Sequence, residues 1–282
     1  MEASRRKRLA PGKSSVPNQI LVQTFLDSSW SFAPVVLSYI DGMKAKEFSD
    51  LIQSRRTVRS FLPDPIPQEV LDSILEDARH CPSWSNTRPY CVAVASGKRL
   101  ERLREAYIDA FEDAAELTSR RPAKILKAAL TRSLPDGDFK PWRPYPKDLL
   151  PRSQQVGRAL YEHVGIARGD REGRRAAQRQ NLEFFGAPTV LWVLAHKKLL
   201  PFSAQDAGLM LQTLILSAKA NGVDSCPLGV LSAWRHPLEA EFEVPRQYGI
   251  LTGLALGYAS DDPVNDFRAV HPPLCQLKAR LK

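Results

Sequence analysis

The chain of 282 residues contains no apolar run approaching the roughly 20 residues needed to span a bilayer. Its basic beginning, MEASRRKRLAPGKSS, is not followed by the apolar segment of a secretory signal. We therefore expect no membrane partner, and we interpret residues 1–18 as a disordered arm. Hydrophobic residues make up 43% and charged residues 25%, which is typical of a globular protein with a sizeable core.

Cysteine, histidine and glycine motifs are also sparse. The four cysteines form no CxxC pair, which favours a reducing compartment and a cytoplasmic location. The five histidines show no HExxH spacing, so no metal site is predicted. No GxGxxG occurs, and the glycines of GILTGLALG lie four apart inside a strand pattern, which disfavours a tightly bound NAD on a Rossmann domain.

Acidic residues are scarce in one stretch only. The net charge is +9, and residues 120–182 hold 15 Lys or Arg against 6 Asp or Glu, whereas the remainder holds 25 of each. Nucleic-acid binding is one interpretation of this excess. Because no nucleic-acid-binding motif accompanies it, a solvated helical face or a rim that attracts an anionic ligand is favoured.

Apolar periodicity predicts helices separated by strands. We expect helices at 67–80, 98–118 and 203–222, with two or three more inside 120–182 and a poorly patterned helical region at 19–50. We expect strands at 90–96, 189–195 and 249–259. Ser203 and Asp206 resemble a capping box at the start of the third helix, and Gly222 suits its end. The order predicts a helix-flanked sheet, α/β or α+β.

SRRTVRSF, residues 54–61, groups Arg55, Arg56 and Arg59 with Thr57. Forked guanidinium donors beside a hydroxyl are what a phosphate group requires, although a solvated charge cluster is the alternative. The extended segment FLPDPIP follows, so these arginines lie at a structural junction.

Two loops are further candidates. CPSWSNTRPY, residues 81–90, places Trp84, Asn86 and Arg88 between a helix and a strand, where an ordinary polar connection is the alternative. GVDSCPLG, residues 222–229, follows the apolar third helix and is expected to be a loop. Its backbone could face a planar heterocycle, or it could be an ordinary helix exit.

These stretches, taken in order with FFGAPTVLW and GYASDDPVNDFRAVHPPL, resemble the nitroreductase family of flavoproteins over about residues 46–275. The resemblance implies an α+β fold with a central mixed sheet wrapped by helices, in an intertwined homodimer that binds two FMN molecules at its interface. It implies an N-terminal arm at 1–45, an FMN-binding domain at 46–275 with a basic helical lid at 120–182, and a tail at 276–282.

The resemblance also assigns the site by position. Arg55, Arg56 and Thr57 are expected at the FMN phosphate and ribityl chain, and Arg59 near flavin N1 and O2. Pro227, Leu228 and Gly229 are expected along the flavin near N5 and O4, and Arg268 at the phosphate. Pro82, Ser83 and Asn86 match a segment that the second subunit supplies, where Trp84 is expected to pack on the ligand or fill the interface.

The implied activity is ping-pong reduction of nitroaromatic or quinone-like acceptors by NADH or NADPH, with no dedicated catalytic side chain. Alternatives on the same fold are dehalogenation, flavin breakdown and heterocycle oxidation, and a basic nucleic-acid-binding protein is the non-enzymatic alternative. Two positions depart from the family pattern. Arg88 stands where Gln is common, and His271 stands where a second arginine is common.

Overall fold

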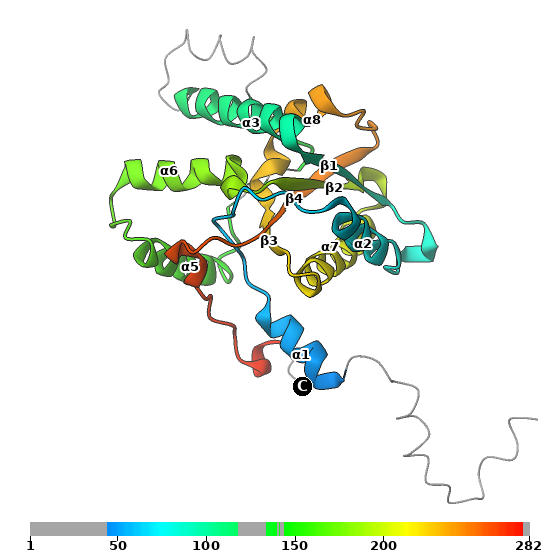
Figure 1. Cartoon of the computed structure of the whole chain (residues 1–282). Helices are drawn as coiled ribbons and strands as arrows, with labels where there is room; N and C mark the ends of the chain where they lie inside the picture. The colour runs from blue at the N-terminus through cyan, green and yellow to red at the C-terminus, as the bar shows by residue number, and fades with distance from the viewer. Residues whose placement is uncertain (1–43, 118–133, 140, 142–143, 279–282) are drawn as a thin grey trace, which may run out of the picture. The chain divides into compact units, whose positions relative to one another are not determined.

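The computed structural model describes residues 44–117, 134–139, 141 and 144–278, which contain the helices and strands labelled in Figure 1. The helices are α1 (Ala45–Ser54), α2 (Gln68–Arg79), α3 (Gly97–Leu117), α5 (Leu150–His163), α6 (Arg171–Leu182), α7 (Phe202–Ala220) and α8 (His236–Glu241). The strands are β1 (Tyr90–Ser96), β2 (Thr189–His196), β3 (Asp224–Leu228) and β4 (Tyr248–Gly257). The chain divides after Phe48, and the larger unit, Ser49–Lys282, contains the sheet.

The four strands form one sheet in the order β1-β2-β4-β3, and every neighbouring pair is antiparallel. The central strand β2 is buried from Thr189 to Ala195, so both of its faces are covered. This explains why its sequence, TVLWVLA, is a continuous apolar run rather than an alternating one.

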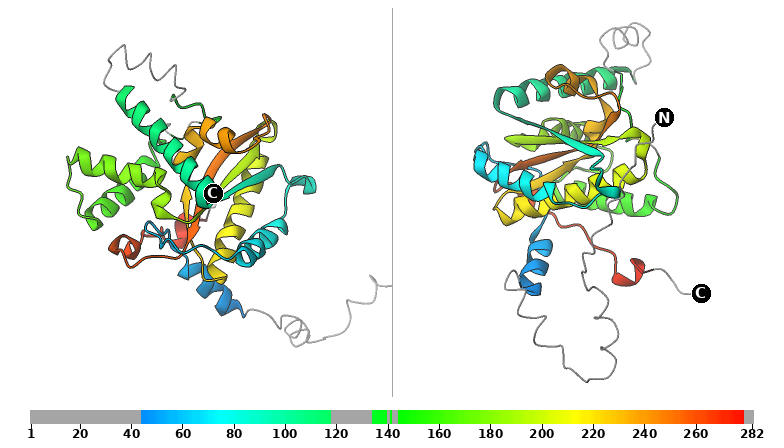
Figure 2. Two further views of the ribbon diagram at one scale, coloured as in Figure 1. Left: turned by 45° about the horizontal axis from the view of Figure 1, so that its top comes forward. Right: turned by 90° about the vertical axis from the view of Figure 1, so that its right-hand side faces the viewer.

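Two hydrophobic cores lie on opposite faces of the sheet, and β2 contributes to both by alternation. Val190, Trp192 and Leu194 pack in a core with residues of α3 and α8. Leu191, Val193 and Ala195 pack in a second core with residues of α2 and α7. The sheet is thus the middle layer between these helix pairs, as the views in Figures 1 and 2 show.

The structure confirms the α+β class and the positions of the expected helices and strands. The expected helix at 67–80 is α2, and the expected strands are β1, β2 and β4 within two residues at each end. α5 and α6 are two helices inside 120–182, of which residues 118–133 lie outside the described part. Residues 19–43 of the expected helical region at 19–50 are likewise outside the described part. The remainder lies in α1, which continues to Ser54, beyond the expected end.

Two sequence expectations are corrected. GVDSCPLG is not a loop throughout, because Asp224–Leu228 forms edge strand β3. The sheet is not mixed in its strand pairs, since the parallel pairing within the described residues is one isolated bridge, Thr57↔Ser225. The strand was not expected because its pairing partners lie far away in sequence and its Pro227 suggests a turn. The mixed sheet was implied by the resemblance alone, and the strand pairs of this chain differ from it.

A buried hydrogen-bond chain joins α3 to the sheet and to the turn before α8. Trp192 Nε1 donates to the Tyr107 hydroxyl at 3.0 Å, and that hydroxyl donates to the carbonyl of Trp234 at 3.2 Å. All three residues are fully buried. Burial raises the pKa of Tyr107, so the phenol stays neutral and can serve as donor and acceptor at once.

Replacing Tyr107 by Phe should destabilise the fold, because the indole N–H of Trp192 loses its buried acceptor. We expect a loss of about 1–3 kcal/mol in the free energy of unfolding, measured by urea denaturation. Tyr145→Phe is the control, since Tyr145 is 59% exposed. Equal stability of the two variants would show that the Tyr107 hydroxyl contributes nothing.

Candidate functional site

The arginine-rich segment lies along the edge of β3. The backbone N–H of Val58 donates to the carbonyl of Ser225 at 3.1 Å, and Thr57 forms the parallel bridge to the same residue. Val58 is fully buried and fixes the segment in the core. The neighbouring side chains of Arg55, Arg56 and Arg59 are only partly buried, so an extended backbone holds three cations beside a sheet edge.

A buried amide ties this segment to the residues that precede Arg268. Asn265, 2% exposed, accepts a hydrogen bond from the backbone N–H of Arg59 at 2.8 Å. Its side-chain nitrogen donates to the carbonyls of Ser60 at 2.8 Å and Ser260 at 3.0 Å. All three hydrogen bonds of this side chain are made to backbone, which indicates a positioning role.

The arginines of this region have no ion-pair partner in the described part of the chain. Among the described residues, no carboxylate forms an ion pair with Arg55, Arg56, Arg59 or Arg268. Arg59 Cζ lies 6.0 Å from the centre of the Phe267 ring, and Arg268 Nη1 donates to the carbonyls of Asn265 and Phe267 at 2.8 and 3.0 Å. The Nε of Arg56 is buried without a hydrogen-bond partner. A buried polar group normally has a partner, and none of the described residues supplies one for this atom.

The end of β3 presents backbone rather than reactive side chains. Pro227 and Gly229 are exposed, but the side chain of Leu228 is 1% exposed and lies in the core, so only its backbone can face a ligand. Burial raises the pKa of the adjacent Cys226 thiol to about 12, and the charge of Arg59 opposes this only partly. The thiol is therefore neutral at physiological pH and is not a nucleophile.

The loop at 82–88 is held in a strained conformation. Ser85, Asn86 and Arg88 have φ of 50°, 56° and 44°, which is uncommon for residues other than glycine. The backbone N–H of Arg88 donates to Ser83 Oγ at 2.9 Å, and that of Trp84 donates to Asp206 Oδ2 at 2.9 Å.

The contact of Asp206 corrects the expected capping box of α7. The carboxylate of Asp206 binds the backbone of the 82–88 loop, and Ser203 Oγ donates to the carbonyl of His196 at 2.8 Å. The residue at the N-cap position is Pro201, which has no side-chain hydrogen bond. Both side chains therefore form hydrogen bonds to residues outside α7, whereas the local pattern assigned them to the cap of that helix. The expectation for the other end is met, because Gly222 follows α7 with φ of 74°.

The sequence-predicted residues fall into two groups at opposite ends of α7. Trp84 stacks on Phe202, the first residue of α7, with ring centres 4.3 Å apart, whereas Thr57 and Val58 contact Ser225, which follows the other end. A helix of this length spans roughly 28 Å. One chain thus gathers Arg55, Arg56, Thr57, Arg59, Pro227, Leu228, Gly229 and Arg268 along one sheet edge, and it places Pro82, Ser83 and Asn86 elsewhere.

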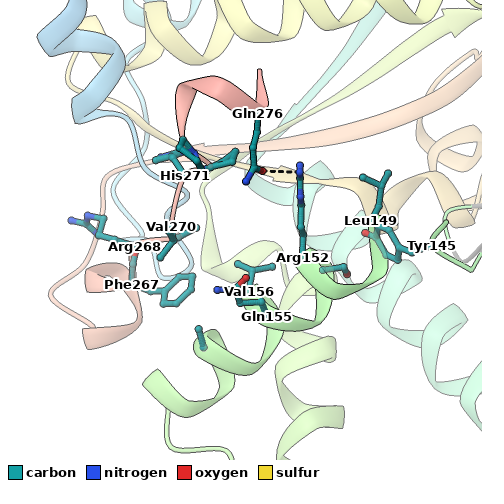
Figure 3. Close-up of a pocket in the computed structure, with 15 residues that line it drawn as sticks. Tyr145, Leu149, Arg152, Gln155, Val156, Phe267, Arg268, Val270, His271 and Gln276 are labelled. Carbon is teal, nitrogen blue, oxygen red and sulfur yellow. Dashed lines mark hydrogen bonds between the residues drawn. The ribbon is translucent and has the colours of Figure 1, made fainter. Parts of the chain in front are cut away.

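A cavity of about 760 Å³ adjoins the first group, between α5 and residues 267–276 (Figure 3). Arg152 Nη2 on α5 donates to Gln276 Oε1 at 2.8 Å across it, and His271 lines it. Phe267 lies on the α5 side, and the guanidinium of Arg268 is directed away from the cavity (Figure 3). At the far end of α5, His163 Nε2 lies 2.7 Å from the carbonyl of Pro263. α5 therefore packs on the segment that holds Arg268.

Sequence reasoning missed Asn265 and Phe267, and it assigned Asp206 to the cap of α7 instead of to the 82–88 loop. Asp262 precedes Pro263 and caps the short helix η6 (Pro263–Asp266), so the DDPVND pattern could have predicted a turn there. No local signal predicts that Asn265 bonds residues about 200 positions earlier. Within the described part of the chain, no cluster of His, Cys, Asp and Glu could hold a metal, and no helix is long and apolar enough to cross a membrane.

The fold and the site define an α+β protein with a cluster of arginines beside an edge strand. A sequence profile of the Nitroreductase family matches residues 52–258, so the chain belongs to the nitroreductase family. It is 34% identical to Nitroreductase NfnB of Mycolicibacterium smegmatis over 211 residues, which are 75% of this chain and 82% of the relative. It is 30% identical to 4-nitrobenzoate reductase of Pseudomonas putida over 227 residues, 79% of this chain and 90% of the relative.

Solved structures give the same family. The crystal structure of the FMN-dependent nitroreductase NfnB from Mycobacterium smegmatis in complex with NADPH superposes with a TM-score of 0.72 at 32% identity, covering 84% of this chain and 99% of that one. The FMN and NADPH-dependent nitroreductase NfnB from Sphigopyxis sp. strain HMH superposes with a TM-score of 0.69 at 28% identity, covering 83% and 98%.

Replacing Asn265 by Ala should release the arginine segment locally. The backbone N–H of Arg59 loses its acceptor, so we expect its hydrogen exchange to become faster. The N–H of Val58 donates to Ser225 and not to Asn265, so its exchange is the internal control. If both amides exchange as slowly as in the unchanged protein, Asn265 does not hold the segment.

Proposed function

We propose that this chain is an FMN-dependent oxidoreductase that uses NADH or NADPH to reduce nitroaromatic or quinone-like small molecules. The observation that supports this most directly is the set of four arginines that have no carboxylate partner among the described residues, including Arg56, whose buried Nε has no hydrogen-bond partner there. A phosphate group supplies the acceptors that such a site lacks. The names of the relatives, which include a 4-nitrobenzoate reductase and an FMN-dependent nitroreductase, support the same assignment.

In this proposal, different residues of the site bind different parts of FMN. Arg55, Arg56 and Thr57 take the phosphate and ribityl chain, and Arg268 adds a second cation at the phosphate. Forked guanidinium donors suit a phosphate better than a lysine would, since each can form two parallel hydrogen bonds. The backbone of Pro227, Leu228 and Gly229 lines the ring system.

Arg59 has an electrostatic role in this proposal. Its backbone is fixed by Asn265 and its guanidinium lies over Phe267, so the cation is positioned before any ligand arrives. Near flavin N1 and O2, a fixed positive charge stabilises the negative charge of the reduced ring. Bound FMN supplies the hydride chemistry, and this chain binds, orients and tunes it without a side-chain acid or base.

We further propose that two chains form the site. Pro82, Ser83 and Asn86 lie too far from the arginines of their own chain and would serve the arginines of a second copy. Exposed apolar side chains near the two groups fit such a homodimer, since clustered apolar side chains on a surface often mark protein–protein interfaces. They are Trp84, Leu200 and Leu209 at one group and Val270, Leu274 and Leu277 at the other.

We also propose domain limits, a lid and a cytoplasmic location. We assign 46–275 to the FMN-binding domain, 1–45 to an arm, 276–282 to a tail and 120–182 to a lid over the site. The profile match at 52–258 supports the first, and the packing of α5 on the Arg268 segment supports the last. The four cysteines are free, which is compatible with a cytoplasmic location.

The function is tested by the absorbance spectrum of the purified protein. We expect about one FMN per chain, bleached by NADH or NADPH without oxygen and restored by a nitrobenzoate. Arg55→Ala should weaken FMN binding by roughly 1.5–3 kcal/mol. Arg246→Ala is the control, because Arg246 is an exposed arginine outside the site. A colourless protein that takes up no FMN would disprove the proposal.

The shared site is tested by mixing two inactive variants. Arg55→Ala disables the arginine group, and Asn86→Gly removes the amide of the loop while permitting its left-handed backbone. In a mixed dimer, the normal arginine group of one chain faces the normal loop of the other. Purified heterodimers should therefore recover one functional site of two, measured as FMN content and activity. If the site lay within one chain, no combination of these variants would recover it.

A further inference from the structure

A second cavity, of about 720 Å³, lies between α5 and the turn that leads to α6. Three arginines line it from separate places in the chain, Arg158 on α5, Arg168 in the turn and Arg174 on α6. Tyr161 and Ile166 provide its apolar wall, and the carboxylate in its lining is Glu162. The residues belong to the basic stretch, whose charge the FMN site does not use.

The three guanidinium groups have no ion-pair partner among the residues that the structure describes. Arg174 Nε is buried without a hydrogen-bond partner, and Arg174 Cζ lies 5.5 Å from the centre of the Tyr161 ring. Arg158 Nε donates only to the carbonyl of Gln154 one turn earlier, at 3.2 Å. Converging cations beside an aromatic ring suit a dianionic phosphate attached to a planar base.

Glycines keep this cavity open. A methyl group added at Gly157 or Gly165 would meet no atom within 4 Å. Gly165 and Gly169 have φ of 73° and 103°, conformations that let the chain turn between the helices and bring Arg168 back toward α5. Gly157 lies inside α5, where glycine makes the helix less stable than alanine would. Helix stability therefore does not explain a glycine at this position.

The cavity is joined to the FMN site by the end of α5. Glu162 lines the cavity, and the next residue, His163, has its ring centre 5.7 Å from that of Phe267. The guanidinium of Arg59 lies over the same Phe267 ring at 6.0 Å. Two side-chain contacts therefore connect His163, the residue after Glu162, to Arg59.

We propose that this cavity binds the adenosine 2′-phosphate end of NADPH, an inference that rests on the function proposed above and deepens it. The three arginines hold the 2′-phosphate, and the adenine lies against Tyr161 and Ile166. NADH lacks this phosphate and would leave the three cations unpaired. The chain is therefore an NADPH-preferring enzyme, with the preference encoded in the α5–α6 pair.

The test is calorimetric binding of adenosine 2′,5′-bisphosphate to the FMN-loaded protein, compared with adenosine 5′-monophosphate and inorganic phosphate at constant ionic strength. We expect the bisphosphate to bind more tightly than either. Arg158→Gln, Arg168→Gln and Arg174→Gln should each weaken its binding by about tenfold or more, as the loss of a charged hydrogen bond implies. Gly157→Leu should do the same by filling the space without changing a charge.

The matched controls are Arg171→Gln and Arg175→Gln, which remove the same charge from exposed positions of α6 outside the cavity lining. They should leave binding within about twofold, since they lie outside the cavity lining and attraction over a longer distance is screened by salt. In parallel, the lining variants should lower kcat/KM for NADPH and leave kcat/KM for NADH unchanged.

Three results would overturn the proposal. Equal binding of bisphosphate and monophosphate, equal losses in the control variants, or equally tight binding of inorganic phosphate would each reduce the cavity to a general anion site. Failure of the proposed function is a separate outcome, seen as absent FMN and absent acceptor reduction. In that case the same calorimetric comparison is made on the protein as purified, and it decides whether this cavity recognises a 2′-phosphate.

Discussion

The hydrogen bonds of the Asn265 side chain are the contacts on which the candidate site depends. One buried amide joins the backbone of Arg59 and Ser60 to the turn before Arg268, so residues about 200 positions apart in the sequence lie next to each other in the fold. Unpaired arginines repel one another, and a flexible segment would separate them. The pairing of Val58 with Ser225 at the edge of β3 supplies the second anchor. The cations are thereby held ready before an anion binds, and the ligand need not order them.

The length of α7 imposes the next constraint. Asp206 and Phe202 near its start hold the 82–88 loop, and Ser225 beyond its end holds the arginine segment. A rigid helix keeps these groups apart in one chain, so any site that uses both needs a second chain. The left-handed residues of the loop suit this function, since a loop held in a strained conformation by its own contacts can present side chains outward.

The basic stretch has a different meaning once its residues are placed. Of its 15 Lys and Arg, seven lie outside the described residues, and the described remainder holds eight against six acidic residues. The described part is therefore nearly balanced, and what distinguishes it is local. Arg179 pairs with Glu112 and Glu183, whereas Arg158, Arg168 and Arg174 converge on a cavity. Whether an arginine of this stretch belongs to a solvated face or lines a cavity depends on its position, and the total charge of the stretch does not decide it.

The sequence by itself determined the elements and their class. The 3.6-residue period of α2, the continuous apolar run of β2 and the glycine after α7 are local signals with local causes, and their order predicts a helix-flanked sheet. The motif SRRTVRSF likewise indicated an anion site.

The tertiary structure decided what each element contacts. It made β3 a strand although Pro227 suggests a turn, it gave Asp206 to a loop instead of its own helix, and it placed Asn265 against Arg59. These outcomes depend on partners distant in the chain, because hydrogen bonds and packing form between whatever surfaces the folded layers bring together, and no local pattern in one sequence specifies those pairs.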